Sequence, residues 1–152
     1  MGPAAWKRAC ASIGVVLALN ATAARAQGDV IGHIMNVAGY ATVTHGDLTY
    51  AAAPGMAVHE HDTLQTLWNG ELGVTFKDDT RISLGHFSKV TIARFTFAPA
   101  QQQYAFVIRL LIGTMQYLSG LTAKLAPDAM KIETPTATIG VRGTRFLARA
   151  AW

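Results

Sequence analysis

Cysteine is almost absent from this sequence, because its 152 residues include only Cys10. Cys10 lies in an N-terminal stretch that we expect to be removed, and the residues before it lack the small apolar pattern of a lipoprotein cleavage site. A mature chain without a thiol forms no disulfide and offers no thiolate as a nucleophile, metal ligand or redox group. We therefore expect the hydrophobic core alone to stabilise the fold.

Charge is also scarce, since charged residues make up only 14% of the chain. The formal net charge is +4, but Lys7, Arg8 and Arg25 all lie in the N-terminal stretch. Without these three, ten basic residues stand against nine acidic ones. No cluster of lysine and arginine is left of the kind that binds nucleic acid or anionic membranes. The sequence predicts that nucleic acid is not a partner.

Long hydrophobic runs are missing too. The uninterrupted apolar run from Ala9 to Leu19 has eleven residues, whereas a membrane span needs about 20. Two basic residues precede the run, and Ala24-Arg25-Ala26 follows it, which is the pattern of a cleavable secretory signal. We predict a signal peptide over residues 1–26, a mature domain over residues 27–152, and a location in the periplasm or outside the cell. No stable membrane span is expected after cleavage, but an uncleaved signal would tether the chain.

Helical periodicity is absent from residue 30 onward, and short two-residue alternations take its place. The alternating apolar positions are Leu72, Val74 and Phe76, then Ile82 and Leu84, then Val90 and Ile92, then Phe95 and Phe97. Turn sequences separate these runs at Asn69-Gly70, Lys77-Asp78-Asp79 and Gly85-His86. The sequence predicts an all-β fold, a single domain of short strands arranged either as a β-sandwich or as a β-roll of solenoid type.

Two later segments differ from these short runs. Residues 104–117 are expected to form one strand, and their apolar run at 106–112 suggests burial on both faces. A short core helix is the alternative for this run, but Arg109 and the β-branched residues favour a strand. Residues 119–130 are the place where a helical turn or an ordered loop is expected, ending at Pro127-Asp128.

The segment from Lys131 to Phe146 has the most particular residue order. Its alternation of Ile139 and Val141 with glycine and arginine predicts a strand. This strand should begin after Pro135, because proline has no backbone N–H to donate to a neighbouring strand. Gly140 and Gly143 predict a place where another backbone comes close.

Residues 134–146 read T-P-T-A-T-I-G-V-R-G-T-R-F, which resembles the segment that closes the core of the FecR-type periplasmic domain. Residues 55–66 and 72–84 are similar to further elements of this domain, with His61 and Asp79 where the family has glycine. Histidine and aspartate both tolerate a left-handed turn better than most residues.

The resemblance implies a stand-alone exported domain, truncated or minimal at its C-terminus. The function we expect is non-enzymatic binding to another envelope protein or polymer, through a strand edge or a shallow surface. The alternative is a sensor component in transmembrane signalling, because the family includes transmembrane regulators of sigma factors.

The candidate binding residues are Gly140, Arg142, Gly143 and Thr144. The guanidinium of Arg142 can hold a carboxylate or several carbonyls in fixed geometry. We favour a structural clamp between strands over ligand binding, since an arginine between two glycines reaches across close backbones.

A less favoured alternative is a metal-dependent hydrolase that uses His59 and His61, two imidazoles on one face of an extended segment. A third ligand would then come from His33, His45 or His86. Spacing alone carries little weight, so we expect no metal site and no cofactor.

Two further groups of residues have simpler interpretations. Asp78 and Asp79 are expected to form a turn rather than an acid–base pair or a calcium site. Trp68 and the phenylalanines at positions 87, 95, 97 and 106 are expected to pack in the core or at its edge.

Overall fold

A computed structural model describes residues 28–151 of the chain. The predicted signal peptide at residues 1–26 lies outside this part. Within residues 28–151, no helix reaches the length and apolar character that a membrane span requires.

Twelve strands and three short helical turns account for most of residues 28–151. The strands are β1 Val30–Ala38, β2 Ala41–His45, β3 Leu48–Ala51, β4 Ala57–His59, β5 Thr63–Thr66, β6 Glu71–Phe76, β7 Arg81–Leu84, β8 Lys89–Ala98, β9 Gln103–Leu118, β10 Met130–Glu133, β11 Thr138–Gly140 and β12 Arg145–Ala150. The helical turns are η1 Pro99–Gln101, α1 Leu121–Leu125 and η2 Pro127–Ala129. The all-β prediction is confirmed, and so is the predicted helical turn within residues 119–130.

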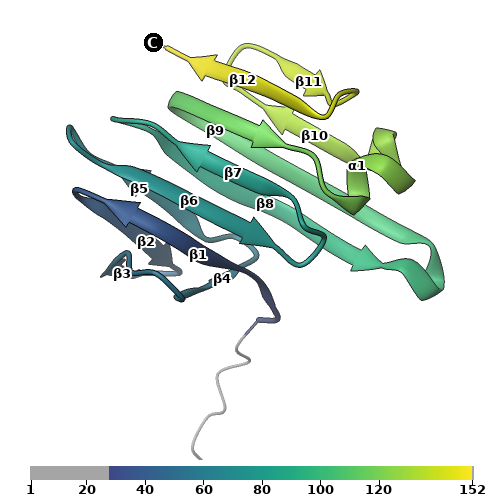
Figure 1. Cartoon of the computed structure of the whole chain (residues 1–152), viewed down its shortest axis with the longest axis horizontal. Helices are drawn as coiled ribbons and strands as arrows, with labels where there is room; N and C mark the ends of the chain where they lie inside the picture. Colours follow the sequence, from purple (N-terminus) through teal and green to yellow (C-terminus); the bar gives the residue numbers. More distant parts are fainter. Residues whose placement is uncertain (1–27, 152) are drawn as a thin grey trace, which may run out of the picture.

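The strands form one sheet that curls into a half-barrel (Figure 1). Its main path runs β3-β2-β5-β8-β9-β7-β6-β1-β4. Strands β10 and β12 also pair with β9, and β11 pairs with β10. Every pairing is antiparallel except that of β10 with β9. The sequence left the choice between a β-sandwich and a β-roll open. The structure is a single curled sheet in which two halves face each other. One half contains β1, β4, β6, β7 and β12, and the other contains β2, β3, β5, β8, β10 and β11.

Strand β9 holds the two halves together. Its first part pairs with β8 and β10, and its last part, from Gly113 to Leu118, pairs with β7 and β12. Gly113 lies at this change of partners with φ of 93°, and a side chain there would meet the backbone of Phe87 and Ser88. Only glycine accepts both the positive φ and the close approach, so Gly113 lets one long strand serve both halves.

Burial along β9 differs from our expectation. Phe106, Ile108 and Leu110 are fully buried, but Arg109 and Leu111 between them are exposed. The prediction that this run is buried on both faces is wrong, because one face of the curled sheet lies against the core and the other faces outward.

The core lies between the two halves of the sheet. Three aromatic rings meet there: Phe76 from β6, Phe95 from β8 and Phe106 from β9, with centroids 4.7–5.9 Å apart. The predicted core role of Phe95 and Phe106 is therefore confirmed.

The turns that depart from the family's glycine pattern keep the backbone shape that glycine would give. His61 has φ of 69° and Asp79 has φ of 62°, as the resemblance implies. Asp78 is fully buried, and its carboxylate accepts hydrogen bonds from Thr80 and from the backbone N–H of Thr122 in α1. Asp78 and Asp79 thus form a turn, as predicted, and Asp78 also fixes the start of α1.

The C-terminal segment corrects a prediction about packing. All three residues of β11 are exposed, and nothing lies within 4 Å of a side chain built at Gly140 or Gly143. The expected close backbone approach at these two glycines is wrong, because β11 pairs only with β10 at the outer border of the sheet. Residues of β12, which pairs with β9, close the core instead: Ala148 and Ala150 are buried.

Candidate functional site

The four predicted binding residues lie close together in sequence but not in one pocket. Arg142, Gly143 and Thr144 line an open pocket of about 500 Å³, whereas Gly140 lies outside it. Pro127 and Asp128 from η2 line its other side. Binding at these residues stays a prediction.

Arg142 does not act as the clamp between strands that we favoured. Its side chain is 84% exposed, and its guanidinium lies 3.7 Å from the exposed carboxylate of Asp128. An ion pair this exposed contributes little to stability. The clamp prediction is wrong because the guanidinium of Arg142 lies in solvent beside Asp128.

The predicted pair of His59 and His61 is not brought together either. His59 ends β4, and its side chain is largely buried. His61 occupies the following turn with positive φ, and its exposed imidazole lies 3.3 Å from the carboxylate of Glu60. The turn ends the alternation of an extended strand, so the assumption that both imidazoles share one face is wrong.

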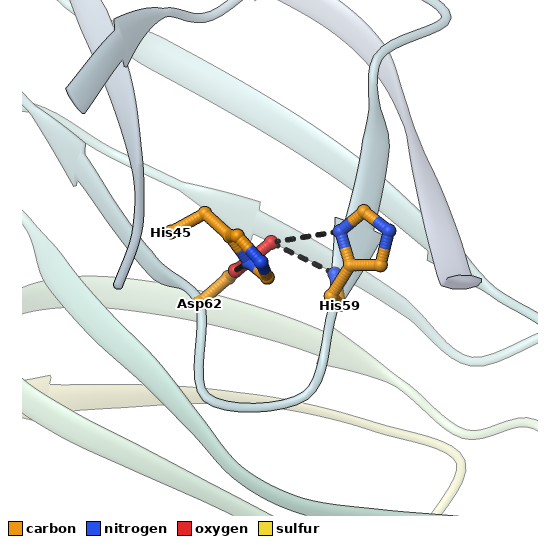
Figure 2. Close-up of side chains that lie close together, drawn as sticks. All are labelled: His45, His59 and Asp62. Atoms are coloured by element: carbon orange, nitrogen blue, oxygen red, sulfur yellow. Dashed lines mark hydrogen bonds and ion pairs between the residues drawn. The ribbon is translucent and has the colours of Figure 1, made fainter. Parts of the chain in front are cut away.

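The structure instead assembles a cluster of His45, His59 and Asp62, here called the seam cluster (Figure 2). His45 ends β2, His59 ends β4, and Asp62 immediately precedes β5. The potential ligand atoms of the three residues all lie within 4.8 Å of one another.

A buried carboxylate is at the centre of the seam cluster. Asp62 is 1% exposed, and its Oδ1 lies 2.5 Å from Nδ1 of His45. Its Oδ2 accepts a hydrogen bond of 2.8 Å from the backbone N–H of His59 and lies 3.6 Å from Nδ1 of the same residue. The two imidazole rings are tilted by 56° relative to each other, with centroids 4.9 Å apart.

The cluster is open to solvent on one side. It borders a pocket of about 300 Å³ that Tyr50 and Met56 also line. The side chain of His45 is 46% exposed at this pocket, whereas that of Asp62, which also lines it, is 1% exposed.

Sequence reasoning missed Asp62 and gave His45 only as one of three possible third ligands. The antiparallel register of β2 with β5 pairs Thr44 with Thr63, so the next pair along the two strands is His45 and Asp62. Gly46 and Asp47 form the turn that joins β2 to β3, but no local pattern identifies β5 as the second neighbour of β2.

A second candidate region is a group of exposed apolar side chains, here called the aromatic surface. It consists of Tyr40, Leu67, Trp68, Phe87 and Leu111. The rings of Tyr40 and Trp68 lie 6.4 Å apart, and backbone hydrogen bonds join Leu67 to both Tyr40 and Phe87. Leu67, Phe87 and Leu111 line one pocket of about 500 Å³.

The aromatic surface corrects our expectation for two rings. Trp68 and Phe87 are each 62% exposed, so neither packs in the core. Phe87 also has φ of 50°, a conformation that a bulky residue adopts rarely and at a cost in free energy.

Comparison with known proteins returns one family. A family model described as FecR protein matches residues 62–151, which include the segment 134–146 that carries the strongest resemblance. No curated protein and no solved structure matches the chain significantly.

Proposed function

This chain belongs to the FecR family, whose members take part in transmembrane signalling, and we propose that it is a non-enzymatic interaction domain of the bacterial envelope. In this proposal the domain is exported to the periplasm or secreted and binds another envelope protein through the aromatic surface. The signal pattern at residues 1–26 supports export.

The observation that carries the proposal is the exposure of three aromatic rings on one surface. Tyr40, Trp68 and Phe87 are each more than 60% exposed, and the aliphatic side chains of Leu67 and Leu111 adjoin them. Contiguous exposed apolar side chains are typical of interaction sites, and tyrosine and tryptophan are enriched among the residues that dominate binding energy.

The backbone conformation of Phe87 supports the same role. A glycine at φ of 50° would avoid the steric cost, yet the chain has a large ring there that buries little of its area. Strain at an exposed side chain is explained when that side chain is needed for binding.

The free strand edges fit a partner less well than the aromatic surface does. Strands β3, β4 and β11 have four, three and three residues, which is short for pairing with an added strand. Strand β12 is longer but carries Arg145 and Arg149, and charges on an edge disfavour strand addition.

Site-specific photocrosslinking in cells tests the proposal. A photoreactive amino acid at position 68 or 87 should crosslink one defined envelope protein, whereas the same group at Leu147 should not. Leu147 is a matched control because it is also large, apolar and highly exposed, on β12.

Binding measurements with the captured protein then separate function from folding. Trp68→Ala should weaken binding by roughly 30-fold, the effect of about 2 kcal/mol at a dominant contact residue. Phe87→Gly should also weaken binding while it preserves or raises the thermal stability, because glycine relieves the strained φ. Equal crosslinking at Leu147, or unchanged affinity in both variants, would exclude the aromatic surface as the site.

The second candidate function is a sensor component in transmembrane signalling, which the role of the family supports. It requires a membrane tether or a partner that supplies one. Mass spectrometry of the protein from cells distinguishes the released interaction domain from the tethered sensor component. A chain that begins at Gln27 is released, and a chain that keeps Met1 is tethered.

A further inference from the structure

We propose that His45, His59 and Asp62 form a zinc-binding site, which lies where the two ends of the curled sheet meet. This site is separate from the aromatic surface. It also revises our expectation from the sequence that the chain has no metal site, because that expectation considered His59 with His61 and left out Asp62.

The donor set suits zinc. Two imidazole nitrogens and one carboxylate oxygen are ligands that Zn²⁺ binds at about 2.0–2.2 Å, and three protein ligands with one open position are common at such centres. Tetrahedral ligands at that distance are separated from each other by roughly 3.3–3.6 Å. The 3.6 Å between Nδ1 of His59 and Oδ2 of Asp62 already matches this separation.

The third ligand needs only a small movement. Nδ1 of His45 lies 2.5 Å from Oδ1 of Asp62, which is a hydrogen-bond distance and too short for two ligands of one zinc ion. Because the His45 side chain is half exposed, its ring is free to turn toward the pocket. Zinc would then replace the hydrogen bond between these two groups, because metal ions displace protons when they bind imidazole and carboxylate.

The burial of Asp62 explains why a cation is favoured here. A carboxylate that is 1% exposed has lost nearly all its contact with water and is costly unless positive charge or hydrogen bonds compensate. The backbone N–H of His59 supplies one hydrogen bond to Oδ2 and also fixes the direction of the carboxylate.

The position of the site in the fold gives the metal a structural consequence. The path of the sheet begins with β3 and β2 and ends with β1 and β4, and no ladder joins β2 to β4 within residues 28–151. Figure 1 shows the labels of β2, β3 and β4 gathered on the same side of the molecule. A zinc ion held by His45 of β2 and His59 of β4 would join these two ends and stabilise the folded state.

The pocket beside the cluster supplies the fourth ligand. Its volume of about 300 Å³ is large enough for water, and Val43, Tyr50, Met56 and Ala57 line it beside the cluster. Solvent, or a donor group from a partner, therefore has access to the open coordination position.

Calorimetric titration of the mature protein with ZnCl₂, after chelation and without a histidine tag, tests the proposal. We expect one zinc ion per chain and a melting temperature that rises with zinc concentration, with no such effect of MgCl₂. His45→Ala is the main variant, because its half-exposed side chain can be removed with little risk to folding. Affinity in this variant should fall by more than the roughly 10- to 100-fold that loss of an outer partner costs.

Two histidines outside the cluster serve as matched controls. His61→Ala and His86→Ala remove exposed imidazoles and should leave zinc affinity unchanged. The proposal is overturned if the titration shows no heat of zinc binding and zinc leaves the melting temperature unchanged. It is also overturned if the two controls lose as much affinity for zinc as His45→Ala does. Loss of binding in His59→Ala, with circular dichroism like that of the wild type, would locate the second ligand.

Discussion

Tyr117 shows how burial changes a single side chain. It is fully buried, it stacks on Phe146 with centroids 4.9 Å apart, and its hydroxyl has no hydrogen-bond partner among residues 28–151. Burial raises the pKa of Tyr117 to about 12, and the nearby charge of Asp78 adds to this effect. The fold therefore favours the neutral phenol.

The raised pKa of Tyr117 gives a prediction about alkaline stability. The unfolded tyrosine has a pKa of about 10, so the contribution of Tyr117 is complete below about pH 10 and is lost as pH rises toward 12. Tyr117→Phe removes the ionisable group. The free energy of unfolding of this variant should therefore fall less between about pH 8 and pH 11 than that of the wild type. Urea unfolding at several pH values measures this, with Tyr50→Phe at an exposed position as the control. Identical pH profiles for the wild type and Tyr117→Phe would contradict it.

Strand β9 is the element on which the architecture depends, and Gly113 is the point where it changes partners. Gly113→Ala adds a positive-φ cost of about 1–2 kcal/mol and an overpacking cost of about 1–3 kcal/mol against Phe87 and Ser88. We expect a loss of roughly 2–5 kcal/mol in unfolding free energy, measured by chemical denaturation.

Gly46 provides the matched control for this prediction. It also has positive φ, of 59°, but nothing lies within 4 Å of a side chain built there. Gly46→Ala should therefore cost only about 1–2 kcal/mol. If both variants lost the same amount of unfolding free energy, close packing at Gly113 would have no role.

The whole molecule is held together where the two halves of its sheet face each other. Phe106 is fully buried and contacts rings from both Phe76 and Phe95. Phe106→Ala should cost about 3–5 kcal/mol, because it leaves a cavity between the halves.

The same contact predicts that the two halves unfold together. Circular dichroism and hydrogen exchange should report a single transition, with amides of β6 and β8 losing protection at the same free energy. The control Phe87→Ala, at an exposed ring, should not lower stability. Protection that survives in one half while it disappears from the other would show that the halves are independent.

Local patterns predicted much of the fold. Alternation at residues 72–76 and 82–84 located β6 and β7, and the turn residues His61 and Asp79 adopt the left-handed geometry that the family pattern implied. Patterns of this kind act over a few residues, so they are readable along the chain. Burial on both faces of residues 106–112 was predicted wrongly, because the outer face of a curled sheet also tolerates apolar side chains.

By itself, the sequence determined the all-β fold class and the turn positions, since period-two alternation and turn chemistry are local. It also determined the family, because the residue order of residues 134–146 is distinctive. Only the tertiary structure decided that His45 meets Asp62, that Arg142 is exposed, and that Trp68 and Phe87 share a surface. These outcomes depend on which strands are neighbours and on how the sheet curls. Strand neighbours are set by the total packing of the core, which no short segment of sequence encodes.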